Sequence, residues 1–373
     1  MKIVLAPDKF KNSLTAMEFC LAVERGIKSV KSDVDIVKLP LADGGDGTIE
    51  VVNYYLNGET VTIEVNDPFF KPIKASYLYS ETSQTAFIEM AEASGMKLLK
   101  EEQFDCKNAT TYGTGEMILD VINKGATKVI LGLGGSATND CGIGMAAALG
   151  YQFLDKKNQP LQPIGANLSK IASINTDGVT PKLSHVQFQI ACDVTNPLYG
   201  KNGAAFTYAA QKGANSQDIE MLDKGLQDFS VVLRAVFNVE PQSVQGAGAA
   251  GGMGIASKVF LKGTLEPGIE LIKKLAGFNE KIEDADWIIS GEGKLDDQTL
   301  LGKTIQGVTT AAKDKNIKVA VFCGIIELNE DNVTNFNISY VDEVIKYATG
   351  IKDAMSNADH YLEEIAKKFM SKF

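Results

Sequence analysis

A Rossmann-like α/β fold is indicated most clearly by residues 128–140, which read KVILGLGGSATND. The apolar run 128–131 has the length and composition of a buried strand, and we predict a helix over 140–149. Between them lies a turn rich in glycine, which lets the backbone approach a ligand closely and point bare N–H groups at it. A strand, a glycine turn and a helix in this order are typical of α/β enzymes that hold a phosphorylated ligand.

Three further glycine-rich segments occur, at 41–48 (LADGGDGT), 246–254 (GAGAAGGMG) and 290–296 (SGEGKLD). The first and the last follow short apolar runs that we predict to be strands. Both carry carboxylates, which can bind a metal ion or accept a proton. No strand is predicted before 246–254, so a flexible linker is its alternative interpretation. Its alanines favour a close backbone approach instead, because linkers are rich in serine and other polar residues.

The order of the predicted elements indicates two domains. The chain opens with strand, helix and strand, and a capping box at Thr15 and Glu18 begins the helix. Three alternating runs between 61 and 90 predict antiparallel strands, and the strand–helix–strand pattern returns after 286. We therefore expect a Rossmann-like parallel-sheet domain built from both chain ends, with an inserted second α/β domain and an active site in the cleft between them. The expected ranges are 1–70 plus 280–373 for the first domain and 71–279 for the second.

Besides the strands already named, we predict strands at 2–6, 36–41, 186–191, 287–289 and 319–322. The predicted helices are 114–124, 216–238, 302–314 and 350–370.

The composition argues against several classes of protein. The formal net charge is −10 and no basic run occurs, so nucleic acid is not an expected partner. No apolar run is long enough to span a membrane, and because a strand is predicted at 2–6 we expect no signal peptide. None of the five cysteines has CxxC spacing, which favours free thiols in a reducing cytoplasm. With only His185 and His360, a Ser-His-Asp triad or a multi-histidine zinc site is not expected.

Charged residues gather in the loops after the first two predicted strands. The first loop, residues 8–13, reads DKFKNS, and its lysines supply the positive charge that an anionic ligand needs; a solvated loop is the alternative. In the second loop, Asp43 and Asp46 could orient a substrate hydroxyl or a Mg²⁺ ion, whereas an ordinary polar turn is the alternative. Their D-x-x-D spacing differs from the D-x-D of aspartate-nucleophile phosphatases, so an aspartyl-phosphate mechanism is disfavoured.

Two later loops contain further candidate ligands. Asp193 follows the predicted strand 186–191 and is a candidate general base or metal ligand, with an Asx turn as the alternative. In the segment 290–296, Lys294 could neutralise a transferring phosphate, and the two carboxylates could bind Mg²⁺, unless this is simply a polar turn. Residues 302–304, GKT, resemble the end of a P-loop, but Asp297 stands where the first glycine of that motif belongs, so the Walker pattern fails.

A rival function comes from the turn 132–137, which matches the G-x-G-x-x-A fingerprint for a pyrophosphate. Asp155 lies near the spacing expected of a ribose contact, so an NAD(P)-dependent oxidoreductase of small hydroxy acids is the alternative. Ser136, Thr138 and the turn amides could equally hold the phosphates of a mononucleotide, and Asp140 either joins them or caps the helix. A sugar-acid-binding regulator is disfavoured, because neither a basic helix nor an appended DNA-reading module is predicted.

Several segments carry a specific resemblance over nearly the whole chain: APDKFK (6–11) with Ser13, ADGGDGT (42–48), TYGTGE (111–116), GGSATND (134–140), ACD (191–193) with NPL (196–198), QKGA (211–214), GAGAAGG (246–252) and GEGKLD (291–296) with Gln298 and Thr299. In these segments the chain resembles the glycerate kinase family, in the group of bacterial two-domain glycerate kinases without a P-loop. The family usually has Ser, Gly, Glu and Gly where this chain has Lys9, Asn12, Asp46 and Cys141.

The resemblance implies ATP-dependent phosphorylation of D-glycerate with Mg²⁺, with 2-phosphoglycerate as the expected product, although glycine loops do not encode which hydroxyl reacts. We expect in-line transfer by a cytoplasmic monomer or homodimer. The expected site residues fall into four groups: catalytic Asp193, Asp43, Lys11 and Asp8; substrate-binding Lys9, Ser13, Gly44 and Gly45; nucleotide- or phosphate-binding Gly134, Gly135, Ser136, Thr138, Asp140, Gly291, Gly293 and Lys294; and metal-binding Asp46, Glu292 and Asp296.

Overall fold

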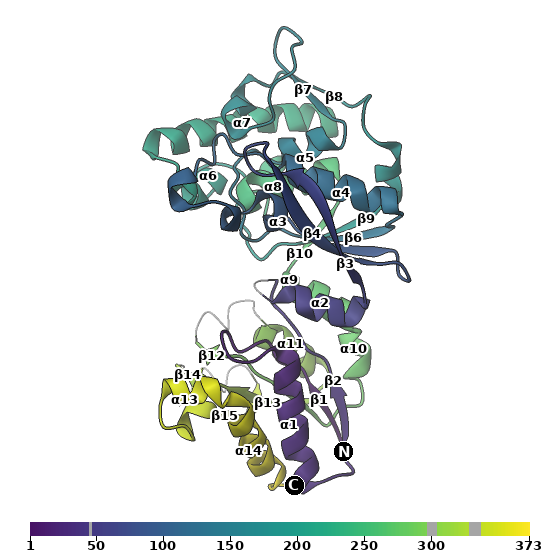
Figure 1. Ribbon diagram of the computed structural model, residues 1–373, viewed down its shortest axis with the longest axis vertical. Helices are drawn as coiled ribbons and strands as arrows, with labels where there is room; N and C mark the ends of the chain where they lie inside the picture. The colour runs from purple at the N-terminus through teal and green to yellow at the C-terminus, as the bar shows by residue number, and fades with distance from the viewer. Residues whose placement is uncertain (45–46, 297–303, 328–336) are drawn as a thin grey trace. The chain divides into compact units, whose positions relative to one another are not determined.

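The chain divides into two compact units, which are described here separately. The computed structural model describes residues 1–44, 47–296, 304–327 and 337–373. The terminal unit consists of Met1–Tyr55 and Pro267–Phe373, and the middle unit of Leu56–Glu266 (Figure 1). These divisions differ from the expected 70/71 and 279/280. Strand β3 (Glu59–Asn66) pairs along its length with a strand of the middle unit, whereas helix α9 (Gly268–Ala276) belongs to the terminal unit.

The terminal unit contains a five-stranded Rossmann-like sheet in the order β15-β13-β11-β1-β2, and every pairing in it is parallel. Strand β1 lies between strands from opposite ends of the chain, so that Ile3 is opposite both Ile36 and Trp287. This arrangement confirms the predicted α/β fold class. The strands are β1 (Lys2–Leu5), β2 (Asp35–Lys38), β11 (Trp287–Ser290), β13 (Lys318–Cys323) and β15 (Ile338–Glu343).

Helices pack against this sheet because a parallel sheet needs apolar cover on both faces. Helix α1 begins at the predicted capping box, in which Thr15 Oγ1 accepts a hydrogen bond from Glu18 N at 3.1 Å. The predicted helix 350–370 is divided at Asn357, whose backbone is not helical. The helices are α1 (Ala16–Val30), α2 (Thr48–Leu56), α9, α10 (Phe278–Lys281), α11 (Thr304–Asp314), α13 (Ile351–Ser356) and α14 (Ala358–Met370); two short strands, β12 (Lys294–Leu295) and β14 (Ile325–Ile326), pair in parallel.

The middle unit contains a six-stranded sheet in the order β10-β9-β6-β5-β4-β3. As predicted, β3, β4 and β5 pair antiparallel, and the remaining pairings are parallel. The strands are β3, β4 (Pro72–Ser80), β5 (Thr85–Glu89), β6 (Lys128–Gly132), β9 (Gln187–Ala191) and β10 (Thr264–Glu266), with a separate hairpin of β7 (Gln152–Leu154) and β8 (Ser173–Asn175). Its longer helices are α4 (Tyr112–Lys124), α5 (Ile143–Ala148), α6 (Ala204–Tyr208), α7 (Ser216–Phe237) and α8 (Ala249–Phe260).

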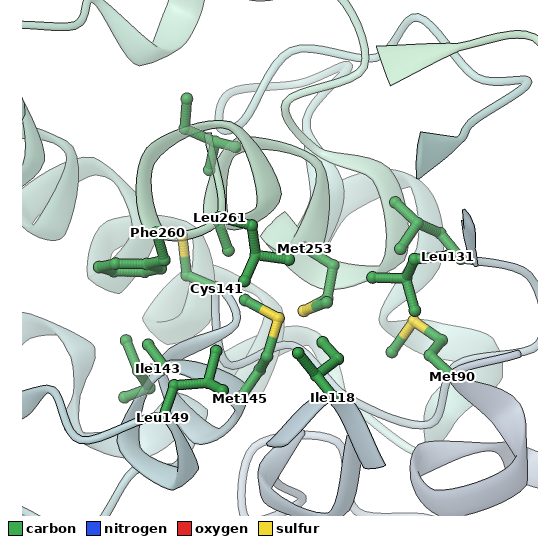
Figure 2. Close-up of a cluster of buried hydrophobic side chains, with 14 of the residues drawn as sticks. Met90, Ile118, Leu131, Cys141, Ile143, Met145, Leu149, Met253, Phe260 and Leu261 are labelled. Carbon is green, nitrogen blue, oxygen red and sulfur yellow. The ribbon is translucent and has the colours of Figure 1, made fainter. Parts of the chain in front are cut away.

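The core of the middle unit joins two of the glycine-rich segments. Met253 of α8 packs in one buried cluster with Leu131 of β6, Met145 of α5 and Cys141 (Figure 2). Helix α8 directly follows the glycines at 246–248, and β6 leads into the turn 132–140. This shared core therefore fixes the two segments against each other, which excludes a flexible linker at 246–254.

Replacing Gly26 with alanine should loosen the packing of the two chain ends. Helix α1 packs along α14, and a Cβ on Gly26 would lie 2.3 Å from the carbonyl oxygen of Glu363. We expect Gly26→Ala to lower the free energy of unfolding of the terminal unit by about 2 kcal/mol, the cost of overpacking. The only tryptophan, Trp287, contacts Phe369 of α14 at a centroid distance of 5.0 Å, so denaturant titration followed by its fluorescence reports on this unit.

The matched control is Gly350→Ala, because a Cβ there meets no atom within 4 Å and the backbone is extended. Its free energy of unfolding should be unchanged or slightly raised. Equal stability of Gly26→Ala and the wild-type protein would contradict the close packing of α1 and α14.

Candidate functional site

In the terminal unit, the loops that follow β1, β2 and β11 meet at one cavity of about 510 Å³. The carboxyl ends of parallel strands share one edge of the sheet, so loops that are distant in sequence come together there. The cavity is lined by many of the residues selected from the sequence, namely Asp8, Lys9, Lys11, Ser13, Asp43, Glu292, Gly293, Lys294 and Asp296. Gly45 and Asp46 lie outside the described residues, and Gly44 directly precedes them. The individual roles of all these residues stay predictions.

The carboxylate of Asp8 is hydrogen-bonded through both oxygens. Oδ1 accepts from the backbone N–H of Lys9 at 2.7 Å, and Oδ2 accepts from Thr304 Oγ1 at 2.6 Å. Burial raises the pKa of Asp8 to about 6; the charge of Asp43 also raises it, while the Thr304 hydrogen bond acts in the opposite direction. Asp8 therefore changes its charge close to neutral pH. Sequence analysis assigned no role to Thr304. Its place in the segment GKT, which resembles the end of a P-loop, was a signal that it could belong to the site.

Lys294 has carboxylates on both sides at the edge of the cavity. Its Nζ lies 2.7 Å from Glu327 Oε2 and 3.4 Å from Asp296 Oδ2. The hydrogen bond to Glu327 is the main cause of a raised pKa of Lys294. Strand β12, which begins at Lys294, pairs with Ile325 and Ile326 of β14, and this pairing places the ammonium group beside Glu327. A fully charged lysine at this edge suits an anionic ligand.

The two glycines before Lys294 serve different purposes. A Cβ on Gly291 would lie 2.1 Å from the carbonyl oxygen of Phe322 and 2.6 Å from the ring of Phe19, so glycine here allows tight packing beneath the cavity. A Cβ on Gly293 would lie 3.5 Å from Lys11 N, so this residue faces the first loop and lines the cavity itself. Gly291 thus supports the loop from below, whereas Gly293 is in the position for backbone contact with a ligand.

A side of the cavity that sequence analysis missed comes from the last part of the chain. Ile345, Ile351, Ala354 and Met355 line it together with Ile325. Helix α13 is attached to the first loop, because Ser13 Oγ donates a hydrogen bond to the carbonyl oxygen of Met355 at 2.6 Å. Ser13, selected as a substrate-binding residue, therefore also holds this helix in place.

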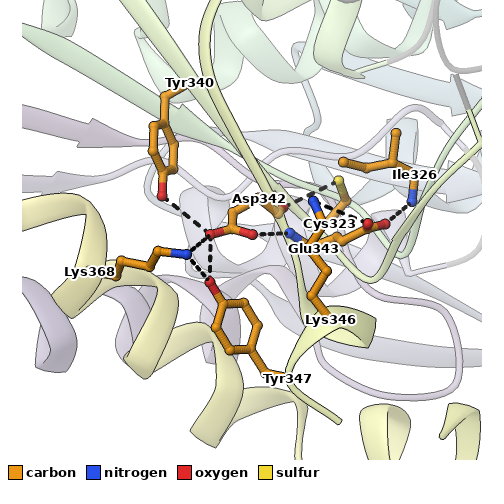
Figure 3. A network of polar contacts seen from close by, with 8 residues as sticks. All are labelled: Cys323, Ile326, Tyr340, Asp342, Glu343, Lys346, Tyr347 and Lys368. Carbon is orange, nitrogen blue, oxygen red and sulfur yellow. Dashed lines mark hydrogen bonds and ion pairs between the residues drawn. The ribbon is translucent and has the colours of Figure 1, made fainter. Parts of the chain in front are cut away.

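A polar network anchors the segment around β14 (Figure 3). Glu343 Oε2 accepts a hydrogen bond from the backbone N–H of Ile326 at 2.6 Å. The neighbouring Asp342 is buried and accepts from the hydroxyl group of Tyr347 at 2.8 Å, and Lys368 lies 3.5 Å from the same carboxylate. These contacts connect the end of β15 to helix α14 and hold β14 beside Lys294.

In the middle unit, the turn after β6 is exposed at its glycines and held from within by a buried lysine. Gly134 and Gly135 are exposed, and their N–H groups donate no backbone hydrogen bond within the described part of the chain. Lys212 Nζ donates to Ser136 Oγ at 2.7 Å and to the carbonyl oxygen of Thr138 at 2.9 Å. Burial lowers the pKa of Lys212 from 10.5 to about 8. The segment QKGA was recognised from the sequence, but this role of Lys212 was not.

Asp140 supports the same turn from inside the protein. Its carboxylate is completely buried and accepts hydrogen bonds from Thr111 N and Oγ1, both at 2.8 Å, and from Gly142 N and Gly144 N. Burial raises its pKa despite these donors. The arrangement resembles the helix-cap alternative, and a direct contact of Asp140 with phosphate stays a prediction.

Left-handed residues at the start of α8 allow it to approach this turn. Ala250, Gly251 and Gly252 have φ values of 50°, 69° and 95°. A Cβ on Gly251 would lie 2.3 Å from the carbonyl oxygen of Thr138, and the carbonyl oxygen of Gly251 accepts a hydrogen bond from Cys141 N at 2.9 Å. The close backbone approach expected at 246–254 is thus a contact with the turn 132–140.

Two other carboxylates selected from the sequence lie elsewhere in the middle unit. Asp193 is exposed and lies two residues after the end of β9. Asp155 accepts hydrogen bonds from Lys157 N at 2.7 Å and Gln159 N at 2.9 Å, which places it in a tight turn after β7. Asp155 therefore stabilises a turn, and no contact with a ribose is needed to account for it. The oxidoreductase alternative finds no support.

The acidic residues of the terminal cavity fit a metal that is brought by a phosphorylated ligand. Across residues 1–44, 47–296, 304–327 and 337–373, no group of three or more His, Cys, Asp or Glu side chains is placed to hold a metal ion. Mg²⁺, however, commonly uses one or two protein carboxylates and takes its other ligands from phosphates and water. Glu292 and Asp296 line the cavity beside Lys294, where such a phosphate would lie.

Comparisons with known proteins agree on one family. Residues 3–373 match the model of the glycerate kinase family. Glycerate kinase of Halalkalibacterium halodurans is 38% identical over 98% of this chain and 96% of its own length, and glycerate 2-kinase of Escherichia coli K12 is 39% identical over 94% and 91%. A crystal structure of a protein from Salmonella typhimurium LT2 assigned as glycerate kinase 2 has a TM-score of 0.90 at 38% identity, covering 100% of this chain and 98% of that one. No helix in the described part of the chain is long and apolar enough to cross a membrane.

Replacing Lys212 with methionine should loosen the turn 132–140. The change leaves the buried carbonyl oxygen of Thr138 without its donor, a loss of about 1–3 kcal/mol. In hydrogen-exchange mass spectrometry, we expect peptides that cover residues 133–141 to exchange faster than in the wild-type protein. Lys201→Met, a change at an exposed lysine, is the control and should exchange normally. Equal protection of the turn in both variants would contradict the supporting role of Lys212.

The lowered pKa of Lys212 also predicts how the stability of the protein depends on pH. Between pH 8 and 10.5 the unfolded chain holds a proton on Lys212 that the folded chain has released. The free energy of unfolding of the wild-type protein should therefore rise with pH across this window relative to that of Lys212→Met.

Proposed function

Since this chain belongs to the glycerate kinase family and is a kinase, we propose that it transfers the terminal phosphoryl group of ATP to D-glycerate and forms 2-phosphoglycerate. The observation that carries the proposal is the family match over residues 3–373, together with 39% identity to a relative named glycerate 2-kinase. The cavity of the terminal unit supports it, because lysines and carboxylates suited to a small anionic substrate line it together.

Lys9 and Lys11 are assigned to the carboxylate of D-glycerate. Both line the cavity next to Asp8 and Asp43, so a bound substrate would have its negative group near the ammonium groups and its hydroxyl groups near acceptors. Lys294 and the amide of Gly293 are assigned to the transferring phosphate at the same cavity. Catalysis then consists mainly of positioning the two reactants and neutralising charge.

The base that receives the hydroxyl proton is assigned to Asp43 or Asp193. Asp43 lines the same cavity as the two substrate lysines, which favours it on geometric grounds. Asp193 lies in the middle unit, and its assignment as a candidate base rests on the resemblance to the family. The nucleotide phosphates are assigned to the turn at Gly134 and Gly135 of the same unit, together with Ser136, Thr138 and Asp140.

Mg²⁺ is assigned to Glu292 and Asp296, with Asp46 as the candidate that lies outside the described residues. When bound, the ion neutralises charge on the phosphate groups. The carboxylates orient it, and Lys294 beside Asp296 limits the negative charge at this edge. A cytoplasmic location is part of the proposal, supported by five cysteines that are free thiols. A monomer or a homodimer remains the proposed oligomeric state.

Phosphorus NMR of the reaction products tests the substrate and the product together. With ATP, Mg²⁺ and D-glycerate, we expect the resonance of a secondary phosphate ester, 2-phosphoglycerate, to grow with that of ADP. Omission of Mg²⁺ should abolish the signal. A primary phosphate ester would contradict the assigned product, and absence of any glycerate phosphate would contradict the function. L-Glycerate is the control acceptor.

Paired variants distinguish the two candidate bases. The variant that removes the true base, Asp43→Asn or Asp193→Asn, should have a turnover about 100-fold or more below that of the wild-type enzyme, because general-base catalysis contributes that much. Asp155→Asn, which changes a carboxylate in a tight turn, is the control and should turn over normally. Rates near that of the wild-type enzyme in both variants would remove the base from the mechanism.

A further inference from the structure

The lining of the terminal cavity has two chemically distinct parts. All the lysines and most of the carboxylates come from the loops after β1, β2 and β11, whereas most of the apolar side chains come from the last third of the unit; the exceptions are Glu327, which follows β14, and Phe10 of the first loop. We call this set the apolar wall; it consists of Ile325, Ile345, Ile351, Ala354 and Met355. The wall borders the charged part directly, because Ile325 is the β-pairing partner of Lys294.

Two side chains of the apolar wall are exposed although they line a cavity. Ile351 is 67% exposed and Met355 is 40% exposed, although both line a cavity. They lie four residues apart on α13, with Ala354 between them, so all three project from the same face of the helix. An apolar face left open inside a cavity points to a ligand with apolar surface of its own.

Helix α13 is held rigidly, so this face exists before any ligand binds. On one side, Ser13 Oγ donates to the carbonyl oxygen of Met355. On the other, the carboxylate of Asp353 accepts hydrogen bonds from Thr349 N at 2.8 Å, from Asn357 Nδ2 at 2.7 Å and from the Tyr361 hydroxyl group at 2.8 Å. These donors hold the pKa of Asp353 far below its usual range, so the anchor persists throughout the physiological pH range. A preformed surface binds at a lower entropic cost.

The cavity has room for a ligand larger than glycerate. A volume of about 510 Å³ lies within the roughly 300–1,000 Å³ of pockets that enclose drug-sized ligands. Glycerate is a three-carbon anion whose groups are nearly all polar, so it can use the lysines but has nothing to place against isoleucine and methionine. A nucleotide has both kinds of surface, a charged polyphosphate and a flat, largely apolar base.

We propose that the apolar wall binds the nucleoside of the nucleotide donor, with its polyphosphate directed from Ile325 toward Lys294. The assignment rests on the proposed kinase function and adds to it the place of the base. It puts the nucleoside on α13 and β14 of the terminal unit, rather than behind the glycine turn 132–140 of the middle unit. The base is then held mainly by apolar contact, while Lys294 supplies the attraction for phosphate.

Substitution of Ile351 tests the assignment on the intact enzyme. Ile351 is largely exposed, so Ile351→Ser should fold normally. We expect it to raise the Kd for ADP, measured by calorimetry, about tenfold, and to leave the Kd for inorganic pyrophosphate unchanged. The KM for ATP should rise by a similar factor, with the KM for D-glycerate unchanged. Leu21→Ser, at a 41% exposed position of α1 outside the cavity lining, is the matched control and should alter none of these values.

Photolabelling locates the base directly. Irradiation of the wild-type protein with 2-azido-ATP and Mg²⁺, followed by peptide mapping, should place the label between residues 325 and 355. Unlabelled ATP should prevent the labelling. A label confined to peptides of the middle unit would overturn the assignment, as would an unchanged Kd for ADP in Ile351→Ser.

Two further outcomes separate this inference from the proposed function. A change of oligomeric state in Ile351→Ser by light scattering, with ADP binding unaltered, would identify the wall as a surface between two copies of the chain and overturn the nucleoside site. If the wild-type protein phosphorylates D-glycerate with no nucleoside triphosphate, the proposed function is contradicted. If Ile351→Ser has normal turnover and an unchanged KM for ATP, only the nucleoside site is contradicted.

Discussion

The parallel pairing of β1 with β2 on one side and β11 on the other is the constraint on which the terminal cavity depends. Strands that run in the same direction end at the same edge, so each following loop must begin there. Asp8, Asp43 and Glu292 therefore reach one cavity although they lie in three distant segments of the chain. An antiparallel order would have sent alternate loops to the opposite edge, and the charged residues would not have met.

Glycine makes that convergence possible at close range, and its use differs between the two units. In the terminal unit, Gly291 lets the end of β11 pass the backbone of Phe322 without a side chain between them. In the middle unit, left-handed Gly251 lets α8 contact Thr138. In the middle unit two of the four glycine-rich segments thus meet by backbone contact, whereas in the terminal unit the other two contribute side chains to the lining of one cavity.

The sequence predicted the fold class and many of the cavity-lining residues, because these depend on local patterns. Apolar runs followed by Asp or Gly identify strand ends, and the parallel topology then brings those ends together. Thr304, Lys212 and the apolar wall were missed for a different reason. Their roles come from tertiary contacts: Thr304 with Asp8, Lys212 with Ser136, and Met355 with Ser13. A helical pattern over 350–370 shows that α13 has an apolar face, but it cannot show that this face lines a cavity instead of the core.

The charges of the terminal cavity explain why a nucleotide would need a cation to occupy it. Lys9, Lys11 and Lys294 share the lining with Asp8, Asp43, Glu292, Asp296 and Glu327, in a chain whose formal net charge is −10. Lys294 is already engaged by Glu327 and Asp296, so its charge is partly compensated before a ligand arrives. Adding a polyphosphate and a glycerate carboxylate to such a lining would be opposed by like charges at short range. A divalent cation that enters with the phosphates would offset that opposition, and the apolar wall could then hold the nucleoside without contributing charge of either sign.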